Sequence, residues 1–474
     1  MAQIVLVNPS AKKAYGDMTP PMYPPLGLGY IAALLEKNGF SVRIIDTDIE
    51  GLENRDFKNI FSGEKPQIVG ITCTTPLYSN ALEIAKIAKD AGAKVALGGI
   101  HPTIKPKECI ENPEIDFLIM GEGEKTFLEI SNAVVSKKDS PKELEKIRGI
   151  VFKKNGKPVY NKPRPLIDNL DELPFPARHL FKQQKYTYPA AQYSPTIPIM
   201  ASRGCPGQCT YCCTKNVFGL RYRTRSVENV IAEIEEVIEK YGAREIHIWD
   251  DNFAVNKKYL LEFCRKIKEK GIHKKVVFAV PQGLRVDQVD EESLRALKSI
   301  NVYSVGFGVE SGNQKILDLA KKGITLEQSR KAIALAKKTG FEVWAFFILG
   351  LYGDTRETMR QTIDFAKELD PDFAKFLILK PFPGTEVFEQ LDRENLVIEK
   401  DYDKYGLYER PIHRLKQASP DDILEMQQIG FREFYLRPKK LLKQLLRIRS
   451  FYGLKVFAGT AWSILRLNIL SGKK

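Results

Sequence analysis

Three cysteines in one short segment are the residues of this chain best suited to chemistry. Cys205, Cys209 and Cys212 have the spacing C-x-x-x-C-x-x-C, in a segment that begins at Arg203. Three thiolates on one loop can hold three irons of a [4Fe–4S] cluster and leave the fourth iron without a protein ligand. The spacing therefore predicts a cluster with an open iron, which can bind a substrate or a cofactor.

Two other uses of these cysteines are less compatible with the sequence. A structural zinc site needs four ligands and usually takes them as C-x-x-C pairs, and neither a second pair nor a nearby histidine accompanies this loop. A disulfide framework is disfavoured because the chain has seven cysteines, a sparse and odd number. Cys213 adjoins the loop but breaks its spacing, and the other cysteines are interpreted as small buried hydrophobic residues.

The length and composition indicate a multidomain globular protein. A chain of 474 residues is too long for one hydrophobic core, so two or three domains are expected. Hydrophobic residues make up 43% and charged residues 28%, and no stretch reaches the roughly 18 apolar residues of a membrane span. We therefore expect a cytoplasmic protein, in reducing conditions that suit an oxygen-sensitive cluster.

The positive charge of the chain is concentrated at its C-terminal end. Of the net charge of +14, residues 431–474 contribute +10, from eleven Lys or Arg against one acid, Glu433. Leu436–Arg449 alternates apolar pairs with cations at helical spacing, which is typical of helices on an anionic membrane surface. Helices packed on the fold with their cations outward explain the pattern equally well. Nucleic acid is a disfavoured partner, because the aromatic residues of this tail lie among many Leu and Ile.

Residues 1–135 alternate short apolar runs with helical patterns, which predicts a Rossmann-like α/β domain with a parallel sheet. The predicted strands are Ile4–Val7, Val42–Ile45, Ile68–Thr72, Val95–Leu97 and Phe117–Ile119, and the predicted helices are Leu28–Asn38, Asn80–Ala91 and Glu124–Val135. Such sheets bind ligands outside the carboxyl ends of their strands. Glycines and small hydroxyl residues follow these strands, which would let a large flat ligand approach the backbone.

The rest of the chain predicts a linker, a second α/β domain and a tail. Residues 136–190 contain a hairpin pattern at Lys153–Lys157 and a proline-rich segment, which favour a linker. Residues 191–400 predict a partial (β/α)6 TIM barrel, and residues 401–474 a helical, basic region. The expected barrel strands are Thr196–Met200, Glu245–Trp249, Val276–Val280, Tyr303–Gly306, Val343–Ile348 and Phe376–Leu379. The cysteine loop follows the first of them, at the end of the barrel where active sites lie.

Taken together, residues 1–400 resemble the cobalamin-binding radical S-adenosylmethionine (SAM) proteins. This family includes methyltransferases, the anaerobic magnesium-protoporphyrin ester cyclase and hopanoid methylases. The cysteine motif is the specific part of the resemblance, and Pro24–Tyr30 and Gly98–Pro102 support it in the N-terminal half. The resemblance implies three cofactors: a [4Fe–4S] cluster on the three cysteines, SAM at its open iron, and cobalamin in the N-terminal domain.

The resemblance also implies which residues bind SAM. Tyr211 would lie against the adenine, Arg285 would bind the carboxylate, and Glu310 the ribose or the amino acid end. The implied set is Tyr211, Asp250, Asp251, Gln282, Arg285, Glu310 and Gly350, with Tyr352 and Lys380 at the substrate mouth. Asp250 and Asp251 replace the Gly-Gly-Glu of many members, so the group that binds SAM there is open. A helix N-cap by Asp251 or Asn252 and a buried ion pair between Arg285 and Glu310 are the structural alternatives.

For cobalamin, the contacts implied by the resemblance are Asn8, Thr74, Gly98, Gly99, His101, Gly121 and Glu122. The D-x-H-x-x-G segment, whose histidine ligates cobalt in the better-known cobalamin domains, is absent. We therefore expect His101 to be a hydrogen-bonding residue and no protein imidazole to coordinate cobalt. A Rossmann-like scaffold without a cofactor is the alternative.

The implied activity is methylation of an unactivated carbon of a small hydrophobic molecule through a 5′-deoxyadenosyl radical. The substrate would be a lipid, isoprenoid or tetrapyrrole, electrons would come from a flavodoxin or ferredoxin, and the tail would favour a peripheral position at the inner face of the membrane. A radical cyclase, oxidase or carbon–carbon coupling enzyme would share every motif. An RNA-modifying enzyme or RNA-binding protein that uses the basic tail is the alternative from another class.

Overall fold

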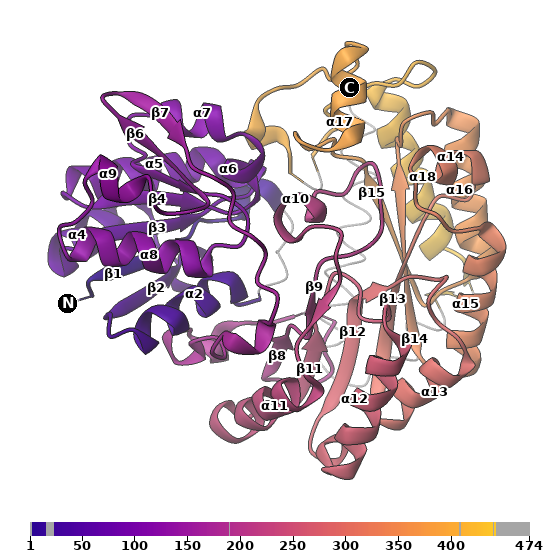
Figure 1. The fold of residues 1–474 in the computed structure, drawn as a ribbon. Helices are drawn as coiled ribbons and strands as arrows, with labels where there is room; N and C mark the ends of the chain where they lie inside the picture. The colour runs from indigo at the N-terminus through magenta and orange to yellow at the C-terminus, as the bar shows by residue number, and fades with distance from the viewer. Residues whose placement is uncertain (1, 16–22, 189, 407–408, 439, 442–474) are drawn as a thin grey trace.

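Two sheets with their covering helices make up the fold (Figure 1). The computed structural model describes residues 2–15, 23–188, 190–406, 409–438 and 440–441. The N-terminal and C-terminal sheets correspond to the two α/β domains predicted from the sequence, and the α/β fold class is confirmed.

The N-terminal sheet has the strand order β2-β1-β3-β4-β5-β6-β7. Its strands are β1 (Ile4–Asn8), β2 (Val42–Asp46), β3 (Ile68–Thr72), β4 (Lys94–Gly98), β5 (Phe117–Ile119), β6 (Ile150–Lys154) and β7 (Lys157–Tyr160). Strands β1 to β5 are parallel, which confirms the Rossmann-like sheet. The order changes direction between β1 and β3, and open α/β sheets bind ligands outside the strand ends at such a point.

Helices cover both faces of this sheet because β1 is apolar on both sides. Ile4 and Leu6 share a core cluster with α2 (Leu26–Lys37) and α8 (Glu124–Val135). Val5 and Val7, which point the other way, share a second cluster with α4 (Asn54–Glu64) and α5 (Tyr78–Asp90). The sequence did not predict α4, because only Phe57 and Phe61, one turn apart, bury an apolar face in an otherwise polar segment.

The predicted hairpin forms β6 and β7. Strand β6 pairs antiparallel with β5, so the hairpin extends the N-terminal sheet. Part of the segment 136–190 is therefore integrated into this sheet, and the remainder passes to the second sheet.

The second sheet has six parallel strands within the described residues, in the order β15-β14-β13-β12-β11-β8. They are β8 (Thr196–Ile199), β11 (Glu245–Ile248), β12 (Val277–Leu284), β13 (Val302–Glu310), β14 (Glu342–Leu349) and β15 (Phe373–Ile378). Neighbours in space are neighbours in the chain, as in the predicted partial (β/α)6 barrel. Strands β12 and β13 run further than predicted, to Leu284 and Glu310.

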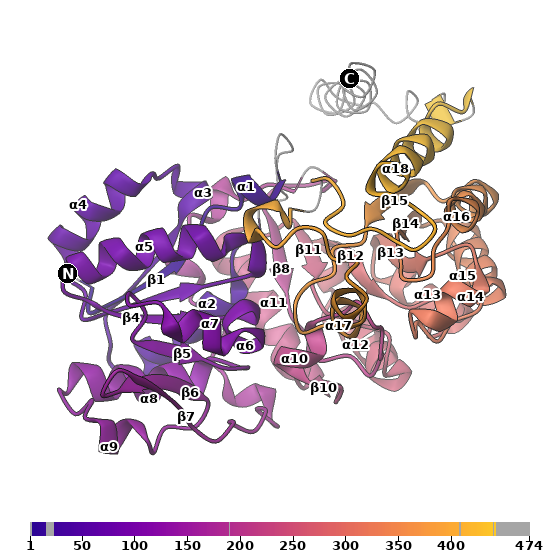
Figure 2. The same ribbon diagram turned by 90° about the horizontal axis from the view of Figure 1, so that it is seen from above.

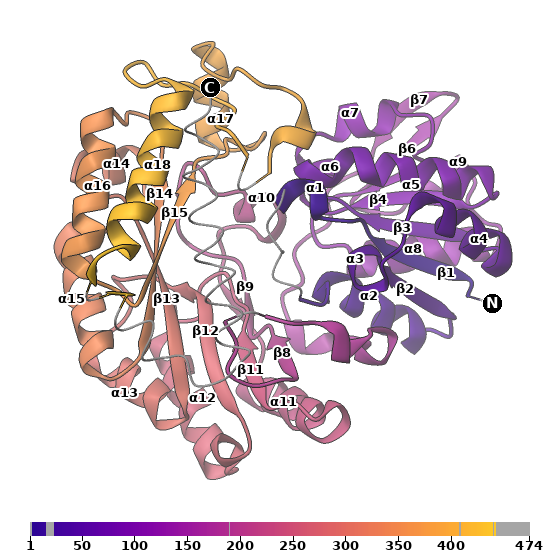
Figure 3. The same cartoon turned by 180° about the vertical axis from the view of Figure 1, so that it is seen from behind.

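The barrel helices lie on the outer side of this sheet (Figures 1 and 3). They are α11 (Val227–Tyr241), α12 (Lys257–Glu269), α13 (Glu291–Ser299), α15 (Leu326–Lys338) and α16 (Arg356–Leu369). Each begins at a side chain that accepts a hydrogen bond from a backbone N–H three residues on: Ser226, Asn256, Asp290, Thr325 and Thr355. These N-caps fix where each helix begins and hence the length of the loop before it.

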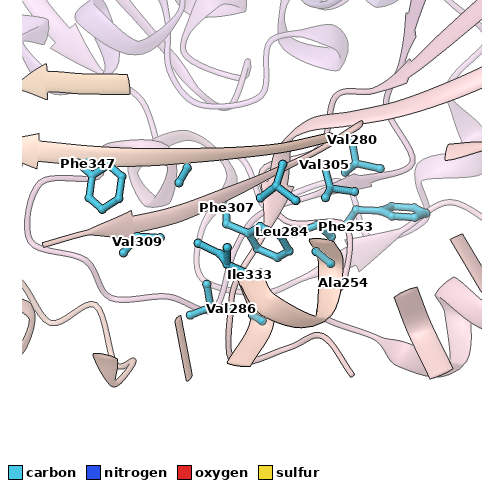
Figure 4. Packing of buried hydrophobic residues seen from close by; sticks show 14 of the residues in the cluster. Phe253, Ala254, Val280, Leu284, Val286, Val305, Phe307, Val309, Ile333 and Phe347 are labelled. Carbon is cyan, nitrogen blue, oxygen red and sulfur yellow. The ribbon is translucent and has the colours of Figure 1, made fainter. Parts of the chain in front are cut away.

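The barrel core fills the space between strands and helices. Side chains such as Val305, Phe307 and Phe347 from the strands meet Ile333 from α15 (Figure 4). Alternate residues of β14 face the opposite, inner side, where Trp344 and Phe346 are half-buried. The inner side of the barrel is thus lined by large side chains that the outer core does not use.

The first residues of the basic tail belong to the barrel. Helix α18 (Pro420–Tyr435) packs on α16 and β15 (Figure 2). Phe434 is fully buried, and Glu433 forms ion pairs with Arg360 and Lys367 of α16. Residues 442–474, which carry most of the predicted amphipathic segment, lie outside the described residues. No helix within the described ranges is both apolar and long enough to span a bilayer.

Candidate active site

The cysteine loop leaves β9 (Ser202–Arg203), which pairs antiparallel with β10 (Arg223–Thr224). Gly204 opens the loop with φ +85, and a Cβ there would lie 2.5 Å from the backbone oxygen of Arg221, so only glycine fits. The loop returns through α10 (Thr214–Phe218). Cys209 is buried, whereas Cys205 and Cys212 are half-buried.

The sulfurs of two cysteines converge on one point. A Cβ on Gly207 would lie 3.4 Å from the Cys205 Sγ, 3.9 Å from the Cys209 Sγ and 3.4 Å from the Arg285 Nη1. Within the described residues, no three His, Cys, Asp or Glu side chains have the geometry of a closed metal site. The fit to a cluster therefore rests on the chemistry and spacing of the three thiols and on this shared position beside a side-chain-free glycine.

A buried ion network joins the cysteine loop to the N-terminal domain. Arg203, two residues before Cys205, bonds Glu122 at 2.9 Å and Glu124 at 2.6 Å. Arg223 donates to Glu122 at 3.0 Å and to the backbone oxygen of Ile167 at 2.6 Å. All four charged side chains are at most 6% exposed. Glu122, predicted to contact cobalamin, thus connects the end of β5 to the cysteine loop.

A second buried pair lies at the end of β13. Glu310 Oε1 accepts a hydrogen bond from Lys322 Nζ at 2.7 Å, and both side chains are 9% exposed. Glu310 has φ +67, a left-handed conformation that is rare for a residue with a side chain. Lys322 was not predicted, because nothing in its local sequence indicates a partner twelve positions away.

The Arg285–Glu310 ion pair, which was the structural alternative to SAM binding, is not formed. Arg285 instead holds Asp287 with two hydrogen bonds of 3.0 and 3.1 Å and donates to the backbone oxygen of Lys322 at 2.9 Å. Tyr211 is half-buried beside Glu310 and Cys209, and burial raises its pKa. The structure thus places Tyr211 and Arg285 at the cysteine loop and Glu310 at the end of the neighbouring β13, and their binding of SAM stays a prediction.

The acidic pair after β11 has divided roles. Asp250 is buried, accepts hydrogen bonds from the Ala201 N–H at 2.7 Å and from the Ser202 hydroxyl, and fixes the chain between β8 and β9. Burial raises its pKa to about 7. Asp251 is exposed and free of a close ion pair among the described residues. Gln282 is also exposed, at the end of β12. Of this set, Asp251 and Gln282 are the side chains accessible to a ligand.

The residues predicted further along the barrel contact the C-terminal segment. A Cβ on Gly350, which has φ +80, would lie 3.1 Å from Ile423 of α18, and the Gly350 oxygen accepts a bond from His413 at 2.8 Å. Tyr352 donates to Glu394 at 2.7 Å. Lys380 is buried against two backbone oxygens of residues 409–410, and burial lowers its pKa to about 8. The structure therefore gives all three an intramolecular packing or hydrogen-bonding role.

The predicted cobalamin contacts lie at the carboxyl edge of the N-terminal sheet. Gly99 has φ +106 and passes so close to the Cys73 backbone oxygen, 2.7 Å from an added Cβ, that no side chain fits. Gly121 has φ +71 and faces α10. Asn8, Gly98 and Gly99 are partly exposed and Thr74 is exposed. Gly99 is thus required by close packing against Cys73, and Asn8, Thr74 and Gly98 are the accessible residues at this edge.

His101 is the exception at this edge because it is fully buried. Its ring lies 4.4 Å from that of Tyr78 and 4.9 Å from that of Tyr402, and Nδ1 is 3.2 Å from the Thr75 hydroxyl. Burial lowers its pKa to about 4. The imidazole is thus packed inside the fold between two phenol rings, with Nε2 buried and without a hydrogen-bond partner among the described residues. That it does not coordinate cobalt stays a prediction.

A hydrogen-bonded chain inside the barrel was also missed. His247 Nε2 lies 2.5 Å from Glu245 Oε1, and because a carboxylate only accepts, Nε2 carries the proton. In the neutral ring with this tautomer, Nδ1 accepts from the Tyr23 hydroxyl, which lies 2.6 Å away. Tyr303 also donates to Glu245, at 2.7 Å. Tyr23 comes from the β1–α2 connection, so the N-terminal domain reaches into the barrel. No sequence signal couples residues more than two hundred positions apart.

Two family descriptions match this chain. The description "Radical SAM superfamily" matches residues 199–366, and "B12 binding domain" matches residues 13–131. The first range contains the cysteine loop and the barrel strands β11 to β14, and the second contains β2 to β5 of the N-terminal sheet.

Proteins with related sequences align over most of the chain. An uncharacterized methyltransferase of Pyrococcus horikoshii is 37% identical over 95% of this chain and 96% of its own length. Cytidylyl-2-hydroxyethylphosphonate methyltransferase of Streptomyces wedmorensis is 32% identical over 83% of this chain and 82% of its own. Anaerobic magnesium-protoporphyrin IX monomethyl ester cyclase of Rubrivivax gelatinosus is 29% identical over 87% of this chain and 74% of its own.

Two solved structures share the fold. The cobalamin-dependent SAM radical enzyme OxsB, solved with aqua-cobalamin and SAM bound, has a TM-score of 0.77 at 16% identity, over 99% of this chain and 72% of OxsB. The radical SAM methyltransferase TsrM of Kitasatospora setae, solved with cobalamin and a [4Fe–4S] cluster bound, has a TM-score of 0.68 at 20% identity, over 83% of this chain and 75% of TsrM. The pairing of a Rossmann-like domain with a partial barrel is thus common to all three.

Proposed function

The chain belongs to the cobalamin-binding family of radical SAM enzymes, and we propose that it is a methyltransferase acting on an unactivated carbon of a small hydrophobic molecule. The observation that carries this proposal is the position of the three-cysteine loop. It lies at the carboxyl end of the barrel and is tied by Arg203 to Glu122, at the ligand-binding edge of the N-terminal sheet. The ion pair thus fixes the cluster-binding loop relative to the edge at which cobalamin would bind.

The residues present fit the three cofactors. Cys205, Cys209 and Cys212 would hold the cluster, and the bare backbone of Gly98 and Gly99 would support cobalamin together with Asn8, Thr74 and Gly121. Tyr211, Asp251, Gln282, Arg285 and Glu310 would bind SAM. When bound, these groups supply the radical and the methyl group. The contribution of the chain is to hold them in register and to exclude water, since the inner barrel side chains are buried or half-buried.

Large side chains on the inner side of the barrel support a hydrophobic substrate. Tyr188, Tyr303, Trp344 and Phe346 line a pocket there, with Lys375 among them. The names of the relatives do not select the substrate, because they include both a nucleotide phosphonate and a tetrapyrrole. The space between these side chains is about 10 Å³, room for about one water, so the pocket would have to open to admit a substrate. The aromatic character of its lining is the argument for an apolar or flat molecule.

The proposal extends to the organisation and partners of the chain. We propose a cobalamin domain at 1–135 that is extended by the hairpin β6–β7, a linker in the rest of 136–190, a radical SAM domain at 191–400 and a C-terminal helical region at 401–474. A flavodoxin or ferredoxin would supply electrons. Cations in the tail would hold the enzyme at an anionic membrane surface, where a hydrophobic substrate is found.

Anaerobic reconstitution tests the catalytic proposal. Wild-type protein should show the broad visible absorption of a [4Fe–4S] cluster and release 5′-deoxyadenosine from SAM under reduction. The Cys205→Ala, Cys209→Ala, Cys212→Ala triple variant should do neither, and Cys213→Ala should do both. Incubation with isotopically labelled SAM and cell lipids or pigments, followed by mass spectrometry, should show a product heavier by one labelled methylene unit. A triple variant that still forms 5′-deoxyadenosine would refute the proposal. A product that lacks the labelled methyl group would favour a cyclase or an oxidase.

A further inference from the structure

The backbone at the end of β13 is shaped to place one carboxylate beside the cysteine loop. The pairing of β13 with β14 shifts between Gly308 and Glu310, so Val309 is an extra residue in β13, and such bulges re-aim side chains. Glu310 then adopts φ +67. Gly308 has no side chain, and a Cβ there would overlap Glu310 Oε1 and lie 2.8 Å from Lys322 Nζ. Three local departures from a regular strand thus make room for a single ion pair.

Lys322 is held in place from the other side by the cysteine loop itself. The Thr210 N–H, next to Cys209, donates to the Ala320 oxygen at 3.0 Å. Arg285 donates to the Lys322 oxygen at 2.9 Å. Burial alone would lower the pKa of the Lys322 ammonium, but Glu310 and Cys209 raise it, and the net direction is upward. Lys322 is therefore a buried cation that is paired with Glu310, in a segment whose backbone is hydrogen-bonded to Thr210 of the cysteine loop.

Two cations lie near the cysteines, and their surroundings distinguish them. Arg285 is half-buried, and the Asp287 carboxylate holds it with two hydrogen bonds in a partly exposed position. Lys322 is 8% exposed, and its partner Glu310 is 7% exposed. Water screens a half-exposed charge strongly and a buried one weakly. Water therefore screens the charge of Lys322 less than that of Arg285.

We propose that Lys322 is a positioning residue that raises the reduction potential of the cluster, and that Glu310 opposes it while fixing its location. Reduction adds one electron, taken from an external donor, to a cluster already held by three thiolates. A buried cation stabilises the added charge, and a buried anion destabilises it. The proposal rests on the cluster-binding part of the proposed function and goes beyond it by assigning roles to two residues through their charge.

The test is an anaerobic redox titration of the reconstituted full chain without SAM, followed by electron paramagnetic resonance of the reduced cluster. Lys322→Met should shift the midpoint potential to more negative values, and Glu310→Gln should shift it to more positive values. Lys322→Arg, which keeps the charge, should stay near the wild type. The Lys322→Met, Glu310→Gln double variant should lie between the two single variants. Lys321→Met is the matched control, because its neighbouring ammonium pairs with Glu386 at the surface.

Each outcome decides a different point. Equal potentials in Lys322→Met and Lys321→Met would overturn the inference, as would a Lys322→Met variant that only binds SAM more weakly at an unchanged potential. If Lys322→Met cannot hold a cluster, the two other single variants decide. Glu310→Gln should shift the midpoint potential to more positive values, and Lys322→Arg should leave it near that of the wild type. Any other result for these two variants would overturn the inference. If the wild type itself binds no cluster, the proposed function fails, and that result is distinct from a failure of this inference.

Discussion

His101 lies at the cobalamin edge of the sheet but is enclosed by Tyr78 and Tyr402. Replacing it with Phe should leave the paramagnetic spectrum of bound cob(II)alamin unchanged, because no imidazole nitrogen is lost from cobalt. Loss of nitrogen hyperfine coupling on this substitution would identify His101 as a ligand. Thr75→Ala removes the neighbouring hydroxyl and serves as a control for local rearrangement.

The same substitution should also change acid stability. Burial lowers the pKa of His101 to about 4, below its ordinary 6.5. Below pH 6.5 the His101 imidazole therefore binds a proton in the unfolded chain but stays neutral in the folded chain. The free energy of unfolding falls as the pH drops towards 4. His101→Phe should lose less stability than the wild type between pH 7.5 and pH 5, measured by urea unfolding. Parallel losses in both proteins would show that the enclosed imidazole is protonated in the fold.

At the scale of elements, the cysteine loop depends on Gly204. Gly204→Ala would place a Cβ 2.5 Å from the Arg221 oxygen, a backbone atom beside β10 that cannot move freely. We expect a marked loss of bound iron and of stability. Gly242→Ala is the control: its φ is +65, but nothing lies within 4 Å of an added Cβ. It should cost about 1 kcal/mol and leave iron content unchanged. Equal iron losses would contradict a specific role for the Gly204 turn.

The repeating elements of the fold could be predicted from the sequence, whereas the contacts between them could not. Apolar runs and helical periodicity located β1 to β5 and the barrel strands, because each pattern is local. The motif likewise located Cys205, Cys209 and Cys212. Gly350 was assigned to SAM, but its packing against Ile423 of α18 depends on a helix seventy residues away. The Glu310–Lys322 pair was not predicted, because it too depends on a contact between residues that are distant in the sequence.

At the scale of the molecule, the Glu122 network joins the two sheets. Glu122→Gln should destabilise the protein by about 3 kcal/mol, because it leaves Arg223 buried without a full counter-charge. Glu172→Gln, which breaks an exposed pair with Lys125, should cost less than about 1 kcal/mol. Urea unfolding of both variants checks this difference. A cost for Glu122→Gln no greater than that for Glu172→Gln would show that the network does not stabilise the junction.

The tail can be tested without disturbing the barrel. Truncation after Leu441 keeps α18 and the pairing of Lys440 with Asp370, and removes seven Lys or Arg. Because each cation near an anionic surface contributes about 1 kcal/mol, co-sedimentation with anionic liposomes at low salt should be lost on truncation. Wild-type binding should survive partly at high salt, since the tail is also apolar. Neutral liposomes are the control, and a wild type that stays in the supernatant at low salt refutes membrane attachment.

The bond from Tyr23 to His247 has a consequence for how such enzymes can be recombined. The phenol comes from the N-terminal domain, but its acceptor lies on β11 among buried side chains of the barrel. A chimera with a foreign N-terminal domain would keep His247 and Glu245 and lose the donor, leaving a ring nitrogen unpaired in an enclosed place. A foreign N-terminal domain should be compatible when its connection between β1 and α2 supplies a hydroxyl at the position of the Tyr23 hydroxyl. The exchange of N-terminal domains between relatives is thus restricted by a single hydroxyl oxygen, which the N-terminal domain supplies to the barrel.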